Sequence, residues 1–316
     1  MMNTVKINVL FMGTPDIAEY CLDSLMKNEN VSVKAVVTQA DKPRGRGHKL
    51  MPPPVKEYAL NNGIDVYQPE TLKDGAFLDT LNKINPDLIV VVAYGKILPQ
   101  YILSYPKYGC VNVHASLLPK YRGAAPIQWA VLNGERETGV TTMMMDEGLD
   151  TGDMLDVVKI ALDSDETSGT LFEKMKVTGA EALNITVNKI ASGTLERTPQ
   201  DHSNMTYAPM ITNEFCYIDF SKGSDEISRL IKGLNPHPGA KTTLEGKILK
   251  LYMAKPLSET SDKKPGTVIA DKKTIKVVCG DSHLIDVTLL QPEGKKKMDA
   301  VSFLLGYNIN NFVLGE

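Results

Sequence analysis

Short runs of consecutive apolar residues alternate with longer amphipathic stretches along the first half of the chain. Four runs have the length and the β-branched content of buried strands: 5–12, 31–38, 88–93 and 109–114. Between the first two runs, apolar residues recur at the spacing of one helix face: Ala18, Cys21, Leu22, Leu25 and Met26. Strands that alternate with amphipathic helices are typical of a doubly wound, mostly parallel sheet, so the pattern predicts an α/β fold.

The turn after the first predicted strand bears on nucleotide binding. Gly13, Thr14 and Pro15 form this turn, and we expect Thr14 to cap the next helix and Pro15 to occupy its first position. Gly13 has no partner glycines at the spacing of the dinucleotide-binding fingerprint. The sequence therefore argues against an oxidoreductase that uses a nicotinamide cofactor.

The pattern changes after a long predicted helix at 167–192, whose apolar residues include Leu171, Met175, Val177 and Leu183. A polar stretch with two prolines follows, and then a predicted helix at 224–232. Short strands separated by glycine and lysine turns are predicted at 247–253, 266–270, 274–278 and 284–290. Strands at this spacing favour a small β-barrel that resembles the OB fold.

Length and composition favour two domains. A chain of 316 residues with 42% hydrophobic residues can bury more than one core. We predict a larger α/β domain at 1–196, a linker at 197–212 and a smaller β-barrel domain at 213–316. We also expect the chain to be a monomer.

Charge and cysteine content narrow the class of protein. Lys and Arg number 35 and Asp and Glu number 38, so the net charge is −3 and any polyanion site must be local. The four cysteines are scattered and no His or Cys group has metal-ligand spacing, so we expect no metal. The sequence has no apolar run long enough to cross a bilayer and no signal-peptide pattern, so we expect a cytoplasmic chain without a membrane partner.

Positive charge is concentrated in two places. Arg44, Arg46 and Lys49 lie in a glycine-containing loop, and Lys295, Lys296 and Lys297 form a second group late in the chain. Glycines disfavour a stable helix, so the loop can become ordered on a polyanion, although short charge runs are also typical of solvated turns. Two basic groups on a slightly acidic chain suit a ligand with a phosphate backbone.

Asn112, His114 and Asp150 carry the candidate chemistry. Asn112 and His114 are two residues apart at the end of a predicted strand, so their side chains point to the same face. Ligands of open α/β sheets bind beyond the carboxyl ends of the strands. An imidazole can move a proton and an amide N–H can hold an oxyanion, while a carboxylate such as Asp150 can fix the imidazole tautomer. This set favours transfer of an acyl-type group.

Ser116 has the right spacing to be considered as a nucleophile. In a proline-bounded loop, however, a serine hydroxyl more often caps backbone groups. The sequence therefore favours direct transfer to an incoming nucleophile over a covalent enzyme intermediate.

Six segments resemble the methionyl-tRNA formyltransferase family, and the resemblance covers essentially the whole chain. These segments are 11–16, 45–52, 91–95, 112–119, 121–128 and 146–153. The Asn-x-His-x-Ser-Leu-Leu-Pro pattern at 112–119 is shared by the wider family of enzymes that use 10-formyltetrahydrofolate. The Gly-Arg-Gly loop and the basic C-terminal extension narrow the resemblance to the tRNA enzymes.

The resemblance implies transfer of a formyl group from 10-formyltetrahydrofolate to the methionyl amine of initiator tRNA, a step that supports translation initiation. It assigns catalysis to Asn112, His114 and Asp150 and tRNA binding to the two basic groups, with Arg46 at the acceptor end. It also implies folate-binding positions: Val91, Val92, Ala93, Tyr94, Gly95, Ile97, Leu98, Ser116, Leu117, Leu118 and Pro119.

In the expected mechanism the amine attacks the formyl carbon, and Asn112 and protonated His114 stabilise the tetrahedral oxyanion. Asp150 favours the imidazolium and orders a water that relays protons. Two alternatives stay open: a formyltransferase that acts on a small amine, and a non-catalytic RNA-binding protein. A glycinamide-ribonucleotide enzyme should need a glycine-rich phosphate turn, which 14–16 does not provide. The intact catalytic set argues against a protein without activity.

Overall fold

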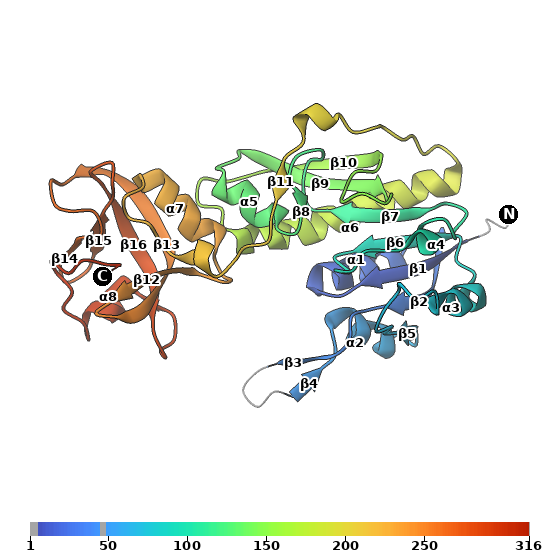
Figure 1. Ribbon diagram of the computed structural model, residues 1–316, viewed down its shortest axis with the longest axis horizontal. Helices are drawn as coiled ribbons and strands as arrows, with labels where there is room; N and C mark the ends of the chain where they lie inside the picture. The colour runs from blue at the N-terminus through green and yellow to red at the C-terminus, as the bar shows by residue number, and fades with distance from the viewer. Residues whose placement is uncertain (1–5, 45–48, 316) are drawn as a thin grey trace. The chain divides into compact units, whose positions relative to one another are not determined.

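The structure, a computed structural model, describes residues 6–44 and 49–315. These residues form two compact units, each with its own sheet (Figure 1). The first unit contains the described residues up to Gly123, together with Glu137–Ala161 and Phe172–Ala208. The second unit contains Ala124–Arg136, Leu162–Leu171 and the described residues from Pro209 onward.

The first unit is built on a seven-stranded sheet in the order β10, β9, β7, β6, β1, β2, β5. Its strands are β1 (Ile7–Gly13), β2 (Val31–Val37), β5 (Asp65–Tyr67), β6 (Leu88–Val92), β7 (Cys110–His114), β9 (Glu137–Met144) and β10 (Met154–Ala161). The five strands β7, β6, β1, β2 and β5 pair parallel with one another, whereas β9 pairs antiparallel with β7 and with β10. The predicted α/β fold with a mostly parallel sheet is confirmed.

Helices connect the parallel strands of this unit (Figure 1). They are α1 (Asp16–Met26), α2 (Pro54–Asn61), α3 (Phe77–Ile84) and α4 (Gln100–Leu103), and α6 (Ser168–Ser192) follows β10. Two short strand pairs lie outside the main sheet. The pair β3 (Lys42–Arg44) and β4 (Lys49–Met51) is antiparallel, and the pair β8 (Arg122–Gly123) and β11 (Tyr207–Ala208) is parallel.

The turn between β1 and α1 differs from the prediction. The helix begins at Asp16, and Pro15 rather than Thr14 occupies the N-cap position. The Thr14 hydroxyl instead lies 3.4 Å from the backbone carbonyl of Tyr94 and 3.4 Å from the backbone nitrogen of Gln39. Thr14 therefore joins the loops that follow β1, β2 and β6, which is a tertiary role that the local sequence does not show.

Two of the apolar residues named in the predicted helices are exposed. Met26 is the last residue of α1, and Val177 lies in α6. Leu171, Met175 and Leu183 of the same helix are buried. Val177 follows Met175 by two positions, which is a rotation of about 200° around a helix, so it lies on the opposite face.

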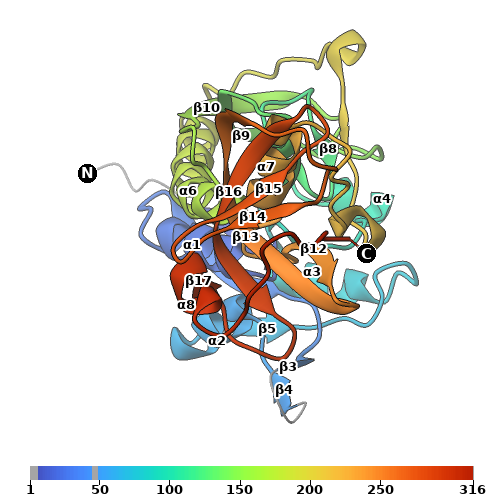
Figure 2. The same ribbon diagram turned by 90° about the vertical axis from the view of Figure 1, so that its left-hand side faces the viewer.

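The second unit contains a six-stranded antiparallel sheet with β13 and β16 at its centre (Figure 2). Its strands are β12 (Ala240–Leu244), β13 (Lys247–Thr260), β14 (Val268–Ala270), β15 (Ile275–Val278), β16 (His283–Pro292) and β17 (Met298–Asp299). The helices α5 (Pro126–Leu132), α7 (Ser224–Gly233) and α8 (Ala300–Leu304) belong to the same unit. The four predicted strands and the predicted helix are present, whereas β12, β17 and α8 were missed.

The segment at 311–315 bridges the two ends of this sheet. Its backbone exchanges hydrogen bonds with β14 and the preceding turn, and the nitrogen of Gly315 donates to the carbonyl of Thr243 in β12 at 3.0 Å. The long strand β13 carries three register irregularities where it pairs with β16. Bulges of this kind bend a strand, as strands in small barrels require. The antiparallel C-terminal domain is confirmed, and these contacts agree with the predicted barrel-like curvature.

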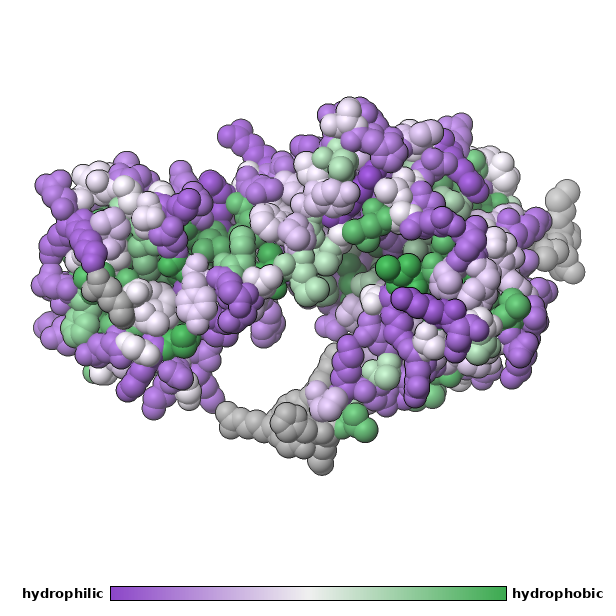
Figure 3. Space-filling view, in the orientation of Figure 1, coloured by the Kyte–Doolittle hydropathy of each residue, from purple (hydrophilic) through white to green (hydrophobic). Residues whose placement is uncertain are grey.

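Hydrophilic residues cover most of the visible face of both units, with apolar residues between them (Figure 3). Beneath this surface the second unit has a core of its own, which includes Ile227, Leu251, Val277, Ile285 and Phe303. No helix of the described residues is long and apolar enough to span a membrane.

Candidate active site

His114 is the last residue of β7 and is 6% exposed. Asn112 lies two residues earlier on the same strand and is partly buried. β7 is held by parallel pairing with β6 on one side and antiparallel pairing with β9 on the other. This double pairing fixes the two side chains on one face at the carboxyl end of the strand, as the sequence predicts.

The ring of His114 is held by a backbone carbonyl. Its Nε2 lies 2.9 Å from the carbonyl oxygen of Tyr121. Because a carbonyl only accepts hydrogen bonds, Nε2 carries a proton in this arrangement. Tyr121 therefore sets the tautomer of the neutral ring, a role that the sequence analysis assigned to Asp150.

Asp150 faces the other nitrogen of the ring. Its Oδ2 lies 3.6 Å from Nδ1 of His114. That separation is longer than a formed hydrogen bond, and a neutral Nδ1 has no proton to donate. A proton taken up by Nδ1 would face the carboxylate directly, so the pair is arranged to stabilise an imidazolium.

The carboxylate of Asp150 is itself anchored. The backbone N–H of Gly123 donates to Oδ2 at 2.8 Å. Asp150 lies in the loop between β9 and β10 with φ of 53°, in the left-handed region. Non-glycine residues adopt this conformation at a cost, so neighbouring contacts must hold it.

The glycines around Asp150 allow the loop to fold tightly. A Cβ atom at Gly152 would lie 1.7 Å from the carbonyl oxygen of Met144. At Gly148 it would lie 1.9 Å from Oγ1 of Thr151. Oδ1 of Asp146 accepts from the Gly148 nitrogen at 3.0 Å and from the Thr151 hydroxyl at 2.6 Å, which orders the loop internally.

The side chains predicted to bind folate at the end of β6 and in the loop after it divide into two groups. Val91, Tyr94 and Leu98 are buried and pack in the core of the first unit. Ala93 and Gly95 are exposed with φ of 45° and 78°, and Ile97 is 80% exposed. Any contact from this segment to a ligand therefore comes from the exposed positions and the backbone.

Tyr94 has a buried hydroxyl for which no hydrogen-bond partner exists among the described residues. Burial raises its pKa to about 12. Because an unpaired buried hydroxyl costs about 1–3 kcal/mol, we expect Tyr94→Phe to leave the free energy of unfolding unchanged or to raise it by up to about 1 kcal/mol. Urea denaturation of the two proteins measures this difference.

The matched control is Tyr101→Phe. The Tyr101 hydroxyl donates to the carbonyl of Leu72 at 2.8 Å, so its removal should lower the free energy of unfolding by about 1 kcal/mol. A loss of stability in Tyr94→Phe as large as in Tyr101→Phe would contradict the unpaired state of the Tyr94 hydroxyl.

The loop after β7 uses Ser116 structurally. Ser116 is buried, and its hydroxyl donates to the carbonyl of Lys120 at 2.7 Å. Thr141 donates to the Ser116 carbonyl and accepts from the Leu118 nitrogen. These bonds agree with the expectation that the hydroxyl caps the backbone, and they leave Leu117 and Pro119 as the partly exposed predicted folate positions of this loop.

The predicted tRNA-binding residues lie in two places. The backbones of Arg44 and Lys49 pair in the β3–β4 hairpin, and Arg46 lies outside the described residues. Lys295, Lys296 and Lys297 are exposed in the second unit. Nζ of Lys297 lies 3.6 Å from the centre of the Tyr252 ring, and its pKa is lowered by partial burial and by the charge of Lys250.

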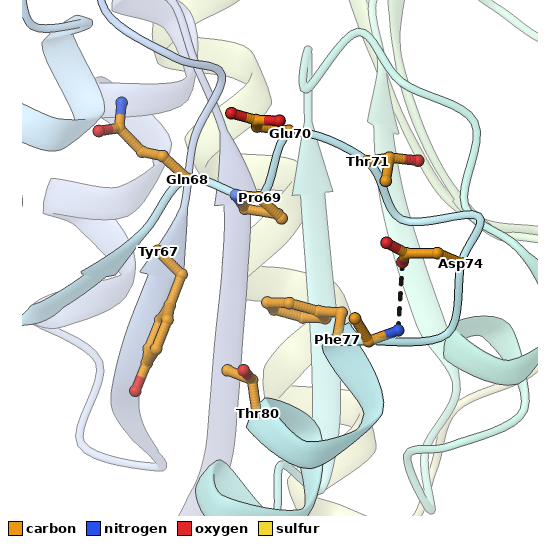
Figure 4. Close-up of a pocket in the computed structure, with 9 residues that line it drawn as sticks. Tyr67, Gln68, Pro69, Glu70, Thr71, Asp74, Phe77 and Thr80 are labelled. Atoms are coloured by element: carbon orange, nitrogen blue, oxygen red, sulfur yellow. Dashed lines mark hydrogen bonds between the residues drawn. The ribbon is translucent and has the colours of Figure 1, made fainter.

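Two cavities lie away from the predicted catalytic residues. One of about 410 Å³ opens between the end of β5 and the start of α3, where Tyr67, Phe77 and Asp74 line it (Figure 4). The other, of about 560 Å³, is in the second unit and is lined in part by Trp129 and Phe215. Among the described residues, no group of three or more His, Cys, Asp or Glu side chains is arranged to hold a metal ion.

Sequence reasoning missed the residues that hold the site together. Tyr121 and Gly123 act through backbone groups, which carry no side-chain signal. Arg122 and Gln200 are buried polar residues that contact one another. Arg122 lies within a segment that resembles the family, which is a signal for its role, whereas Gln200 lies in the polar stretch that the sequence predicts to be a linker.

Comparison with known proteins gives a consistent result. Residues 5–187 match the formyl transferase family, and residues 210–308 match its C-terminal domain. The chain is 48% identical over 304 residues to the methionyl-tRNA formyltransferase of Caldanaerobacter subterraneus subsp. tengcongensis, a match that covers 96% of this chain and 98% of the relative. It is 49% identical over 311 residues to that of Clostridioides difficile, which covers 98% and 100% of the two chains.

A solved structure shares the fold. HypX from Aquifex aeolicus in complex with tetrahydrofolic acid is similar with a TM-score of 0.63 and 17% sequence identity. The match covers 96% of this chain and 47% of the HypX chain, so this chain spans about half of that protein.

Proposed function

The chain belongs to the formyl transferase family and, within it, to the methionyl-tRNA formyltransferases, and from this we infer that it formylates the amino group of methionyl initiator tRNA. The formyl donor is 10-formyltetrahydrofolate. The reaction supplies the formylated initiator for translation. A formyltransferase that prefers a small amine and a non-catalytic RNA-binding protein are not favoured by the near full-length similarity.

One observation carries the chemical part of the proposal: Nδ1 of His114 lies 3.6 Å from Oδ2 of Asp150 at the end of β7. Nε2 is occupied by the Tyr121 carbonyl. Nδ1 is therefore the ring atom that can exchange a proton with a substrate. Uptake of that proton produces an imidazolium between a carboxylate and a carbonyl, both of which stabilise positive charge.

The reaction joins the methionyl nitrogen to the formyl carbon. The amine lone pair attacks the carbon, and the C=O electrons move to the oxygen to give a tetrahedral intermediate. The amine loses a proton, the oxyanion re-forms the C=O bond as the bond from carbon to the folate nitrogen breaks, and that nitrogen takes up a proton as it leaves. His114, assisted by Asp150, is proposed to hold the proton in transit.

Asn112 is proposed to hold the developing oxyanion. Its carboxamide is partly buried and lies on the same face of β7 as His114. A donor whose backbone is fixed by a strand has little need to reorganise during the reaction. No covalent intermediate on Ser116 is required, because its hydroxyl is bonded to Lys120.

The folate co-substrate is proposed to contact the loops after β6 and β7. Exposed backbone at Ala93 and Gly95 can meet a polar heterocycle, while Ile97, Leu117 and Pro119 offer apolar surface. The buried Val91, Val92, Tyr94, Leu98 and Leu118 would support these loops from the core. We propose that all of these positions contribute to folate binding, either by direct contact or by support of the loops.

The basic groups are proposed to bind tRNA. For Arg46→Ala we expect kcat/KM for charged tRNA to fall about tenfold while folate affinity is retained, because a cation that binds phosphate contributes to tRNA binding and not to donor binding. The slope of log(kcat/KM) against log salt should decrease by about one if the contact is a phosphate. If Arg46 reads a base, discrimination against elongator tRNA should fall and the slope should change less.

Arg136→Ala is the matched control, since Arg136 is an exposed arginine outside both basic groups. It should leave kcat/KM and the salt slope unchanged. Equal tRNA kinetics for Arg46→Ala and the unmodified protein at every salt concentration would remove Arg46 from the proposed surface.

The remaining assignments are also proposals. We place the protein in the cytoplasm, because its substrate is charged tRNA and its cysteines are buried and unpaired. The monomeric state expected from the sequence stays a proposal. Residues 1–196 are proposed to form the formyltransferase domain, 197–212 the linker and 213–316 the tRNA-binding domain.

Incubation with 10-formyltetrahydrofolate and either charged initiator tRNA or small amines tests the function. We expect formylmethionyl-tRNA as the product, with at least a hundredfold lower rates for glycinamide ribonucleotide or amino sugars, as a specific site requires. Faster formylation of a small amine would replace the proposed acceptor, and the absence of any transfer would favour an RNA-binding protein.

A further inference from the structure

The side chain of Gln200, which lies outside the loop between β9 and β10, holds the backbone around Asp150. Nε2 of Gln200 donates to the carbonyl of Asp150 at 2.9 Å and to the carbonyl of Gly152 at 2.7 Å. Both N–H protons of the Gln200 carboxamide therefore donate to carbonyls of the same turn. Both carbonyls lie on the C-terminal side of the Asp150 Cα atom, directly after the backbone whose φ of 53° is left-handed.

The other end of the Gln200 carboxamide is fixed as firmly. Oε1 accepts from Nε of Arg122 at 3.1 Å and from Nη2 at 2.5 Å. Nη2 of Arg122 also lies 3.1 Å from Nδ1 of His202. Arg122 is 3% exposed and Gln200 is 6% exposed, so the contact between these two side chains is formed away from solvent, whereas His202 is exposed.

Arg122 also connects this network to His114, because the residues on either side of Arg122 in the chain contact the site. Tyr121, whose carbonyl accepts from His114, and Gly123, whose N–H donates to Asp150, are its immediate neighbours. The backbone nitrogen of Arg122 donates to the carbonyl of Thr206, within the β8–β11 pairing. One buried arginine therefore lies between the two backbone groups that orient His114 and Asp150.

We propose that Gln200, held by Arg122, is a positioning residue that sets the distance between Asp150 and His114. This inference rests on the proposed function, because it assumes that the Asp150 carboxylate assists His114. Gln200 touches neither His114 nor the carboxylate. It acts through the backbone of the turn that presents Asp150.

The contacts require an amide at this position. A glutamate could still accept from Arg122 through a carboxylate oxygen, but it has no N–H to donate to the carbonyls of Asp150 and Gly152. Gln200→Glu therefore keeps the size and the Arg122 contact while it removes both bonds to the turn and places oxygen against oxygen. A purely structural account, in which the side chain only fills a polar interior, predicts little change in chemistry once the protein is folded.

For Gln200→Glu we expect the single-turnover formylation rate to fall about ten- to a hundredfold, as a small misplacement of a catalytic group causes. KM for the folate donor should change little, because Gln200 lies outside the positions proposed to meet the donor. The melting temperature should fall, because two buried hydrogen bonds to the turn are lost, so the rate is measured well below the melting temperature of the variant. Asn62→Asp is the matched control: the Asn62 amide donates to the carbonyl of Tyr58 at the end of α2, and its loss should leave the rate unchanged.

A double-mutant cycle with Asp150→Asn identifies the route of the effect. Once the carboxylate is absent, its position no longer matters, so Gln200→Glu should slow the Asp150→Asn enzyme by less than twofold. Independent, multiplicative losses would overturn the proposal, and so would a normal rate for Gln200→Glu alone. If Asp150→Asn itself reacts at the normal rate, the proposed function of the carboxylate fails first, and this inference fails with it.

Arg122→Lys provides a second variant in case Gln200→Glu does not fold. Lysine keeps a cation near Oε1 but cannot make both contacts of the guanidinium. We expect a smaller loss of rate that again disappears in the Asp150→Asn background. A loss of rate that persists in that background would contradict the proposed route through Asp150.

Discussion

Replacement of His114 by alanine should lower the single-turnover formylation rate by about two to four orders of magnitude, which corresponds to about 3–5 kcal/mol of transition-state stabilisation. Nδ1 is the ring atom left free for proton exchange, since Nε2 donates to the Tyr121 carbonyl. The alanine variant loses both the proton carrier and the cationic donor. Rapid-quench measurement with saturating donor and charged initiator tRNA reports this rate.

Folate binding should largely survive this substitution, because His114 is buried and is not one of the exposed loop positions proposed to meet the donor. The matched control is His283→Ala. Nδ1 of His283 also faces a carboxylate, Oδ2 of Asp281 at 3.7 Å, but this pair is exposed in the second unit. The control should react at the normal rate. Near-normal single turnover by His114→Ala would remove the imidazole from the mechanism.

Replacement of Asp150 by asparagine should slow the chemical step by about two orders of magnitude while the fold is retained. The new side chain can still accept from the Gly123 nitrogen through its amide oxygen, and the Gln200 contacts are made by the backbone. Only the charge opposite His114 is lost. Without it the imidazolium has no anionic partner, so the proton-transfer step becomes less favourable.

Asp146→Asn is the control for this substitution. Asp146 lies in the same loop, and the oxygen that accepts from Gly148 and Thr151 is retained in asparagine. It removes an equal charge without touching His114, and its single-turnover rate should stay within about threefold of normal. Equal losses in the two variants would show that charge or loop order, rather than the His114–Asp150 pair, determines the rate.

The parts of the fold that sequence predicts well are those with a strong local pattern. The four apolar runs of the first half became β1, β2, β6 and β7, because strands buried on both faces must be continuously apolar. The antiparallel strands β9 and β10 were missed. β9 is buried over seven of its eight residues but contains threonines, so its sequence does not stand out. Its threonine hydroxyls form hydrogen bonds with residues distant in the chain. One example is the bond between the hydroxyls of Thr142 and Thr186.

The reactive side chains of the candidate site could be predicted from the sequence, because their residue types indicate the chemistry. Spacing alone placed Asn112 and His114 on one face of a strand end, and glycines pointed to the turn at Asp150. The distance between His114 and Asp150 depends on the backbone of Tyr121 and Gly123 and on Gln200, which is 50 residues from Asp150 in the chain. Contacts of that kind are set by tertiary packing, so neither propensity nor spacing encodes them.

The most direct test of the whole account is a rapid-quench single turnover with donor labelled at the formyl carbon, in the presence of charged initiator tRNA and a competing small amine. We expect label to pass from the folate to the methionyl nitrogen, with no covalently labelled protein at any time and with negligible transfer to the competitor. Label that accumulates on the protein, or that reaches the small amine before the tRNA, would contradict direct transfer to methionyl-tRNA at the His114–Asp150 site.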